Sequence, residues 1–257
     1  MEIFLVSILV FFVAILTFFS GFGLGTILSP IFMIFFPVDL AIALTGVVHL
    51  FNNIFKLFLV GKNADKFVLF RFGIPAIIFA FVGAFTLINI INLSPIFSYE
   101  LNGKFFFISP IKFIIAILLI TFVMMDLISH FRKLQFEKNN LILGGILSGF
   151  FGGLSGHQGA LRSIFLIKSG LTKEAFIGTS VVIAVFIDFT RLTIYASHFT
   201  KIDFNFNITM IVCAIISGIC GSYFGNKLLK KITLKFIQVF VSAILIVISL
   251  LLGFGII

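Results

Sequence analysis

The sequence predicts an all-α, polytopic integral membrane protein with about 8–10 membrane segments arranged as two inverted repeats. Three observations predict this class. First, 61% of the 257 residues are apolar and 11% are charged, whereas a soluble domain carries about a quarter charged residues. Second, apolar runs of about 18 residues or more recur from end to end, which is the length that a transmembrane helix needs. Third, two glycine-rich turns each precede a similar long segment.

Apolar segments are expected at 3–20, 22–36, 40–60, 70–91, 111–128, 141–151, 157–167, 175–195, 206–224 and 237–257. The second, sixth and seventh are short for a hydrocarbon layer of about 30 Å at about 1.5 Å of helical rise per residue. They adjoin the glycine clusters "SGFGLG" (20–25) and "GGLSG" (152–156). Each cluster therefore predicts a broken helix pair, either as two thin crossings or as one re-entrant hairpin.

Loop charge sets the expected orientation. The basic loops are 61–71, 130–138 and 226–235, and the less basic loops are 92–110 and 196–205. The positive-inside rule places the basic loops together in the cytoplasm, which requires that each glycine-centred pair enters and returns. Both termini are then expected to face outward. The net charge of +9 is thus explained by membrane orientation, and no nucleic-acid partner is expected.

An internal repeat is visible in the sequence. The stretch "FPVDLAIALTGVVHLFNNIFKL" (36–57) aligns without gaps onto "LTKEAFIGTSVVIAVFIDFTRL" (171–192). The aligned polar pairs include Asn53 with Asp188 and Lys56 with Arg191. Each stretch follows a glycine-rich turn and precedes two further segments, which predicts a duplicated unit.

The whole chain, 1–257, is expected to form one membrane domain. Repeat one occupies about 1–129, a basic linker 130–140, and repeat two about 141–257. The loop charges start the two halves on opposite sides of the membrane. An inverted repeat of this kind lets secondary transporters build two access states around one site.

Arg162 is the strongest candidate for a functional residue, because an ionisable group deep in a bilayer is costly and usually marks a pathway or a partner. Breaking the helix at "GGLSG" frees backbone N–H groups at the start of the next half-helix, and these donors favour an anion. The Arg162 guanidinium adds a planar cation suited to oxyanions. The alternative is that Arg162 snorkels to the interface or pairs with a buried acid.

Both glycine turns are expected to contribute to one chemically asymmetric anion site. The second turn supplies charge and donors, and the first supplies backbone groups and hydroxyls. The expected substrate-binding residues are Arg162, His157, Gln158, Ser155, Gly156, Gly159, Gly23, Gly25, Thr26 and Ser29. Close helix packing explains the glycines of the first turn equally well, and it is the expected role of Gly221 and Gly225 in "GSYFG".

Two helical faces are candidates for gating or ion coupling. They are formed by His49, Asn53 and Lys56 in the first half and by Ser180, Asp188 and Arg191 in the second. Asp188 and Arg191 have the i, i+3 spacing of an ion pair, which lowers the cost of burying either. The alternatives are snorkelling for Lys56 and Arg191 and a structural role for His49.

No enzyme motif is present. The sequence contains neither HExxH nor GxSxG, and "GFGLG" lacks the third glycine of a dinucleotide fingerprint. Cys213 and Cys220 fall in one apolar segment and provide neither a disulfide framework nor metal spacing. We therefore expect no catalytic residue, no metal and no cofactor.

A glycine turn, a short apolar segment and an acidic residue that opens a long helix occur twice, and together they resemble the TauE/SafE sulfite exporter (TSUP) family of bacterial membrane permeases. The likeness is closest at 152–195, beginning "GGLSGHQGALRS", and at 18–62, which contains "GFGLGTILSP". It covers essentially the whole chain. Many members have "GIGGG" turns followed by proline, so the two turns of this chain depart from the pattern and leave the substrate open. The resemblance implies ATP-independent transport of small sulfur-containing anions or organosulfonates without a bound cofactor.

Residues and resemblance together predict a secondary transporter of sulfite, organosulfonates or related sulfur oxyanions that works by alternating access. The expected partners are the anion and the lipid bilayer, and a homo-oligomer is compatible with the sequence. If an ion is coupled, protons are expected, because His49, His157 and Asp188 can titrate. Two alternatives remain: a membrane enzyme with His157 and Asp188 as acid and base on a lipid-borne substrate, and an accessory subunit without a substrate. Neither alternative needs two inverted copies.

Overall fold

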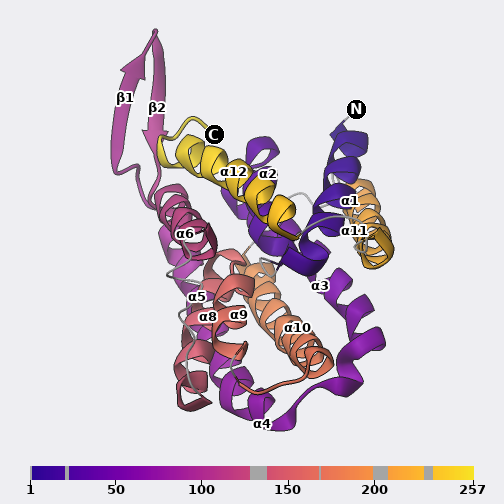
Figure 1. The fold of residues 1–257 in the computed structure, drawn as a ribbon. Coiled ribbons are helices and arrows are strands. Elements are labelled where there is room, and N and C mark those ends of the chain that lie inside the picture. The colour runs from indigo at the N-terminus through magenta and orange to yellow at the C-terminus, as the bar shows by residue number, and fades with distance from the viewer. Residues whose placement is uncertain (1, 21–22, 128–137, 168, 199–207, 229–233) are drawn as a thin grey trace.

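The computed structural model describes all residues except 1, 21–22, 128–137, 168, 199–207 and 229–233 (Figure 1). Its helices are α1 (Glu2–Ser20), α2 (Leu24–Phe35), α3 (Val38–Val60), α4 (Lys66–Val68), α5 (Ile74–Ile91), α6 (Pro110–Leu127), α8 (Leu141–Ser155), α9 (Gly159–Leu166), α10 (Lys173–His198), α11 (Ile208–Leu228) and α12 (Leu234–Gly253). Two strands, β1 (Phe97–Leu101) and β2 (Lys104–Ile108), join α5 to α6. Short 3₁₀ turns at Gly61–Asn63 and Lys138–Asn140 and a π turn at Leu69–Gly73 complete the described elements.

Several helices have the length and composition of membrane spans. Within the described residues, the long apolar helices are Val38–Asn63, Lys66–Ile91, Lys173–His198 and Ile208–Gly225, and shorter apolar helices run over Ile3–Thr17, Leu24–Phe35, Pro110–Met125, Leu141–Ser155 and Val239–Gly253. Large apolar side chains such as Phe58 and Phe70 are exposed on these helices. Such a surface belongs against lipid, which supports a multi-pass membrane protein.

The helix that contains α5 begins earlier than the sequence predicts. Residues 61–71 are expected to be a loop, but helical backbone starts at Lys66 and continues through the π turn into α5. The cause is local: the Asp65 side chain accepts a hydrogen bond from the Val68 N–H at 2.9 Å and so caps the first turn. The loop on this side of the molecule is correspondingly short.

Both glycine turns interrupt helical structure. Gly23, with φ +78°, precedes α2, and Gly156, with φ +84°, ends α8 in the left-handed conformation that favours glycine. The second break falls at Gly156 and not at Gly152, because Gly152 and Gly153 still belong to α8. Whether the short helices after the breaks cross the membrane or re-enter remains a prediction.

Glycines also let α8 lie directly on α5. A Cβ at Gly145, Gly149 or Gly153 would collide with the carbonyl oxygens of Phe72, Ala76 and Ala80, respectively. The small-residue stripe of α8 therefore brings two helix backbones into contact, as is common between membrane helices. Gly221 of α11 meets the Phe11 carbonyl of α1 in the same way, which confirms the packing role expected for this glycine.

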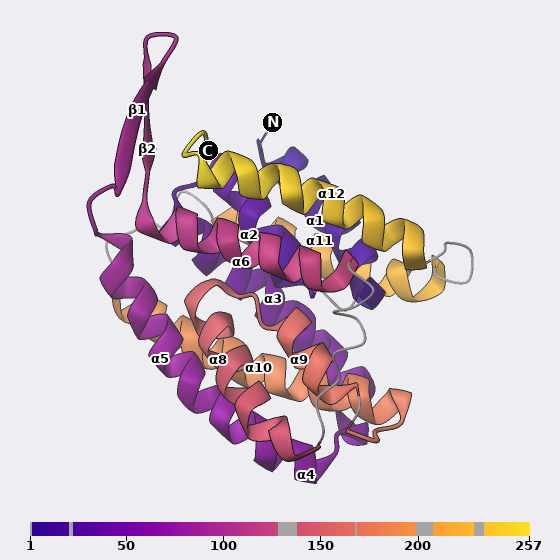
Figure 2. The ribbon, with the colours of Figure 1, turned by 60° about the vertical axis from the view of Figure 1, so that its left-hand side comes forward.

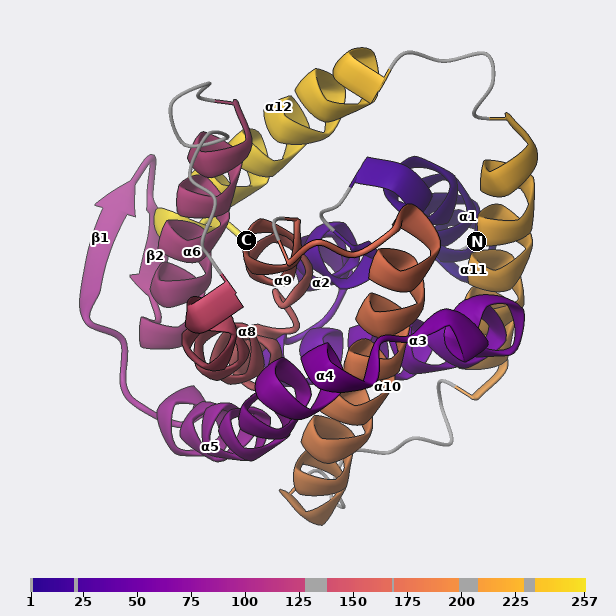
Figure 3. The ribbon, with the colours of Figure 1, turned by 60° about the horizontal axis from the view of Figure 1, so that its bottom comes forward.

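The helices pair across the two halves of the chain. Helix α5 packs on α8, α1 on α11, α3 on α10 and α6 on α12, and Figure 2 shows α6 beside α12 while Figure 3 shows α1 beside α11. Each pair joins one helix that precedes residue 128 to one that follows residue 140. The two halves are thus interleaved, and the main apolar core contains residues from both.

A β-hairpin departs from the all-α expectation. Residues 92–110 are expected to be a loop, but β1 and β2 pair antiparallel from Phe97 with Ile108 to Leu101 with Lys104. Asn102 and Gly103 both have positive φ, of 52° and 74°, as in the Asn-Gly type I′ turn that closes hairpins. The hairpin projects from the helices (Figure 1), and at its base the Tyr99 hydroxyl donates to the Phe254 carbonyl at 2.7 Å.

The contact between α5 and α8 yields a stability prediction. Gly149→Ala places a Cβ against the Ala76 backbone, which cannot move aside as a flexible side chain can. Because overpacking costs about 1–3 kcal/mol, we expect a lower melting temperature for the purified protein in detergent. Gly73→Ala is the matched control, since its Cβ would meet only Ile183 Cγ1 at an ordinary 3.6 Å. Equal melting of the Gly149→Ala variant and the wild type would contradict this packing.

Candidate functional site

A cavity of about 420 Å³ lies between α3, α9 and α10, next to the first glycine turn. This volume falls within the range of about 300–1,000 Å³ that is typical of small-molecule sites. The lining residues are Thr17, Gly23, Leu24, His49, Asn53, Lys56, Leu59, Val60, Arg162, Ser163, Lys173, Phe176, Ile177, Ser180 and Val181. Polar and charged groups thus share the cavity with a largely apolar wall.

Helical spacing explains which residues of α3 and α10 reach the cavity. On α3, the lining residues His49, Asn53, Lys56 and Val60 follow one face at intervals of three or four. On α10, Lys173, Ile177 and Ser180 do the same. The predicted face of His49, Asn53 and Lys56 is therefore present in the structure and points into one cavity.

The cavity is closed at one end and open at the other. At the closed end, His49 and Asn53 are only 4% and 5% exposed. At the other end, Leu59 is 52% exposed and Lys173 is also exposed. Because α3 and α10 run antiparallel, with His49 against Asp188 and Val60 against Gly178, the exposed ends of both lining faces lie together and form the mouth.

The cavity is positively charged. Its cations are Lys56, Arg162 and Lys173, and no Asp or Glu occurs among the described residues that line it. Lys56 and Arg162 are close enough for their charges to repel each other. An anion between them would relieve this repulsion.

Arg162 is buried and is oriented by one neighbour. Its Nη1 donates to Gln158 Oε1 at 3.0 Å, and its Nε has no hydrogen-bond partner among the described residues. A guanidinium with an unused donor at a cavity wall is suited to an oxyanion. The side chain does not pair directly with an acid within the described residues, so the geometry favours the anion-binding interpretation over the alternative of an acid partner.

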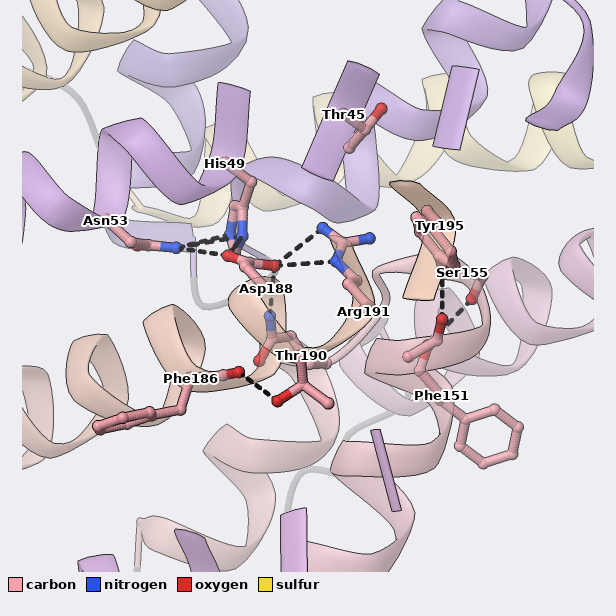
Figure 4. A network of polar contacts seen from close by, with 12 residues as sticks. Thr45, His49, Asn53, Phe151, Ser155, Phe186, Asp188, Thr190, Arg191 and Tyr195 are labelled. Atoms are coloured by element: carbon pink, nitrogen blue, oxygen red, sulfur yellow. Dashed lines mark hydrogen bonds and ion pairs between the residues drawn. The ribbon is translucent and has the colours of Figure 1, made fainter. Parts of the chain in front are cut away.

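Asp188 lies behind the closed end of the cavity, and side chains from several parts of the chain contact its carboxylate (Figure 4). Its Oδ1 accepts from Arg191 Nε at 3.0 Å and from Gln158 Nε2 at 3.2 Å, and its Oδ2 faces His49 Nδ1 at 2.5 Å and Asn53 Nδ2 at 3.4 Å. Arg191 Nη2 completes an ion pair at 2.9 Å. The predicted i, i+3 pair is confirmed, and Arg191 does not snorkel, because it is fully buried beside Asp188.

Close contacts seal the side opposite the mouth. A Cβ at Gly46 would lie 2.9 Å from Leu192 Cδ2 and 3.3 Å from Arg191 Cζ. A Cβ at Gly156 would lie 2.7 Å from Arg191 Nη1. The Tyr195 hydroxyl, farther along α10, donates to the Gly153 carbonyl. The Arg191 guanidinium therefore fills the space between α3 and the second glycine turn.

The two glycine turns meet at the cavity wall. A Cβ at Gly25 would lie 3.0 Å from the Gly156 carbonyl oxygen, and a Cβ at Gly23 would lie 3.7 Å from Gly159 Cα. Of the expected substrate-binding residues, Arg162 and Gly23 line the cavity, and the others lie behind its wall: Gly25, Thr26, Ser29, Ser155, Gly156, His157, Gln158 and Gly159. Their contact with a substrate remains a prediction.

His157 has a mainly internal environment in this structure. It is fully buried, its Nδ1 lies 2.8 Å from Ser155 Oγ, and its ring stacks on Phe122. Its Nε2 has no partner among the described residues. Gln158, by contrast, connects the cavity to the buried ion pair, because it contacts both Arg162 and Asp188.

Three polar lining residues, Thr17 on α1, Ser163 on α9 and Lys173 on α10, were not among the expected site residues. Lys173 is the first residue of α10, and Ser163 follows Arg162 on α9. The signal for Lys173 was its spacing: it stands seven residues before Ser180 and therefore on the same helical face. The expected apolar segment 175–195 begins after Lys173 and therefore leaves this lysine in the preceding loop.

Comparison with known proteins gives one family. The model of the family described as "Sulfite exporter TauE/SafE" matches residues 6–252. No curated protein matches the chain, and no solved structure matches it. The matched range contains every residue that lines the cavity.

The charge of the cavity predicts that Arg162 determines anion affinity. Arg162→Gln removes the buried guanidinium while keeping a polar side chain, so we expect the Kd for sulfite or thiosulfate to rise at least about tenfold. Isothermal titration of purified protein measures this change. Arg71→Gln is the matched control, because Arg71 is an exposed arginine above Phe67. Unchanged affinity in Arg162→Gln would refute the anion site.

The buried pair predicts strong coupling between Asp188 and Arg191. Asp188→Asn leaves the Arg191 guanidinium buried without its counter-charge, and breaking such a pair costs about 3–5 kcal/mol. We expect Asp188→Asn and Arg191→Gln each to lower the free energy of unfolding in detergent. The double variant should be less destabilised than the sum of both single variants. Strict additivity would show that the two charges do not interact.

Proposed function

Because the chain belongs to the TauE/SafE sulfite exporter family, we propose that it carries sulfite, organosulfonates or related sulfur oxyanions across the membrane as a secondary transporter. The family and the apolar helices indicate a multi-pass membrane transporter. The observation that supports an anionic substrate is the cavity itself. It is lined by three cations, and no acid occurs among its described lining residues.

The structure corresponds to a state that is open on one side. The mouth lies at the end of α3 that leads into residues 61–71. This segment carries Lys62, Lys66 and Arg71 against Asp65 alone, an excess of two basic residues. The positive-inside rule assigns such a segment to the cytoplasm. We therefore propose a cytoplasm-open state in which the seal at Gly46, Arg191 and Tyr195 faces outward.

Internal repetition supports alternating access. The sequence repeat aligns Lys56 with Arg191 and Asn53 with Asp188. In both α5–α8 and α1–α11, a helix of the first half packs on a helix of the second half. In an inverted repeat, the two halves exchange conformations when access changes sides. Arg191 would then take the place of Lys56 as a lining cation, and the contact between Gly46 and Leu192 would open.

The alternative functions gain no support from the geometry. An enzyme that uses His157 and Asp188 as acid and base needs both side chains at one substrate. In the structure, neither lines the cavity, and Asp188 is occupied by Arg191, His49 and Gln158. An accessory subunit would not require a cationic cavity in the membrane region. Transport thus accounts for more of the observed features.

A reversible cross-link across the outer seal tests alternating access. In a background with Cys213→Ser and Cys220→Ser, Gly46→Cys and Leu192→Cys place two thiols where α3 and α10 touch. We expect oxidation to abolish uptake of sulfite or thiosulfate into proteoliposomes, because the outward-open state can no longer form. Addition of a reductant should restore uptake, so the same protein serves as its own control.

Two results would overturn the proposal. Uptake that persists in the fully cross-linked protein would show that the contact between Gly46 and Leu192 does not open during transport. Uptake by the wild-type protein that equals uptake by empty liposomes, for every sulfur oxyanion tried, would reject anion transport by this chain.

A further inference from the structure

We propose that His49 is the proton site of this transporter and that a proton travels together with the anion. This inference rests on the proposed function, which supplies the anion. The observation behind it is the position of His49, which lines the cavity and also contacts the buried carboxylate of Asp188. The charge of His49 depends on which of its ring nitrogens carry a proton and on the charged groups around the imidazole.

Hydrogen bonds around Gln158 fix the ionisation of Asp188. An arginine can only donate, so the contact from Arg162 Nη1 identifies the Gln158 atom that faces it as the oxygen. The Gln158 amide group therefore donates through Nε2 to Asp188 Oδ1, which also accepts from Arg191 Nε. With Arg191 as its ion-pair partner, Asp188 is an acceptor and carries the negative charge.

The ionised Asp188 in turn fixes the tautomer of His49. The distance of 2.5 Å between His49 Nδ1 and Asp188 Oδ2 requires a proton between these atoms, and this proton belongs to Nδ1. In neutral His49, Nε2 is therefore the unprotonated nitrogen, and Asn53 Nδ2 lies 3.3 Å from it. Nε2 lies on the cavity side, 4.0 Å from where a Cβ of Gly23 would stand. A proton that enters through the mouth can bind there.

The surrounding charges couple this protonation to the anion. The charged groups that face His49 are Lys56 on its own helix and Asp188 and Arg191 from α10, and Arg162 of α9 lines the same cavity. The positive charges of Lys56 and Arg162, which line the same cavity, oppose a further positive charge on His49. An anion bound between them removes this opposition, and a protonated His49 in turn attracts the anion.

Thermodynamic linkage makes this effect reciprocal. The anion favours proton binding by the same factor by which the proton favours anion binding. Because both bind from the same cavity, both are released to the same side after the access change. The result is proton–anion symport, in which a proton gradient can drive movement of the anion or the reverse.

The other two titratable groups that the sequence offers for proton coupling, His157 and Asp188, do not fit this role. His157 is fully buried, contacts Ser155 and Phe122, and is not part of the cavity lining. Asp188 is kept ionised by Arg191. His49 thus combines a place in the cavity lining with a buried partner, Asp188, that holds the imidazole in place.

Calorimetry of wild-type protein measures the linked proton directly. Sulfate and ethanesulfonate are suitable probes, because neither changes its own charge in the neutral range. Titrations at one pH in two buffers with different ionisation enthalpies give the number of protons taken up per anion. We expect uptake of up to one proton, and an affinity that rises up to about tenfold when the pH is lowered by one unit through the titration of His49.

Substitutions assign the proton to a residue. His49→Gln should still bind the probes but without proton uptake and without the pH dependence. His198→Gln is the matched control, because His198 is exposed at the end of α10, and it should retain the wild-type proton uptake. Melting curves of each variant verify that it is folded.

Each outcome distinguishes the two proposals. Binding without proton uptake in the wild type would overturn symport and leave anion transport intact. Proton uptake that persists in folded His49→Gln would overturn the assignment to His49. Absence of binding by any sulfur oxyanion in the wild type would instead remove the proposed function on which this inference rests.

Discussion

The carboxylate of Asp188 is the constraint on which the rest of the site depends. It is fully buried, and a buried charge is tolerated only when it is paired and hydrogen-bonded. Arg191 supplies the counter-charge from one turn farther along α10, and His49, Asn53 and Gln158 supply the remaining contacts. These donors come from α3 and from the segment between α8 and α9, so one charge fixes the relative positions of three parts of the chain.

This pairing determines the electrostatics of the cavity. Arg191 is the ion-pair partner of Asp188, so the acid lies behind the cavity wall while Lys56 and Arg162 line it. The cavity remains cationic although an acid lies directly behind it. Gln158 connects the two regions through its amide, with its oxygen on Arg162 and its nitrogen on Asp188. A change in the charge of the cavity can therefore alter the contacts of the buried pair through Gln158.

Backbone contacts hold this polar centre in a membrane environment, where no hydrophobic driving force acts between helices. The glycine stripe of α8 fits against α5, and Gly221 fits against α1. These contacts leave no space for a side chain, so they fix the axial position of α8 and hence of the turn at Gly156. Gly156 and Gly46 in turn leave just enough room for the Arg191 guanidinium.

The sequence by itself determined the membrane class, the two helix breaks, the face of His49, Asn53 and Lys56, the pair of Asp188 and Arg191, and the family. These features depend on composition, on glycine chemistry and on spacing within one helix, all of which are local. The hairpin also has a local signal in the Asn102–Gly103 pair. Only the tertiary structure decided that Lys173 lines the cavity while His157 and Gln158 lie behind its wall. The physical reason is that a cavity forms between helices: its lining depends on the antiparallel packing of α3 and α10, which spacing within either helix cannot specify.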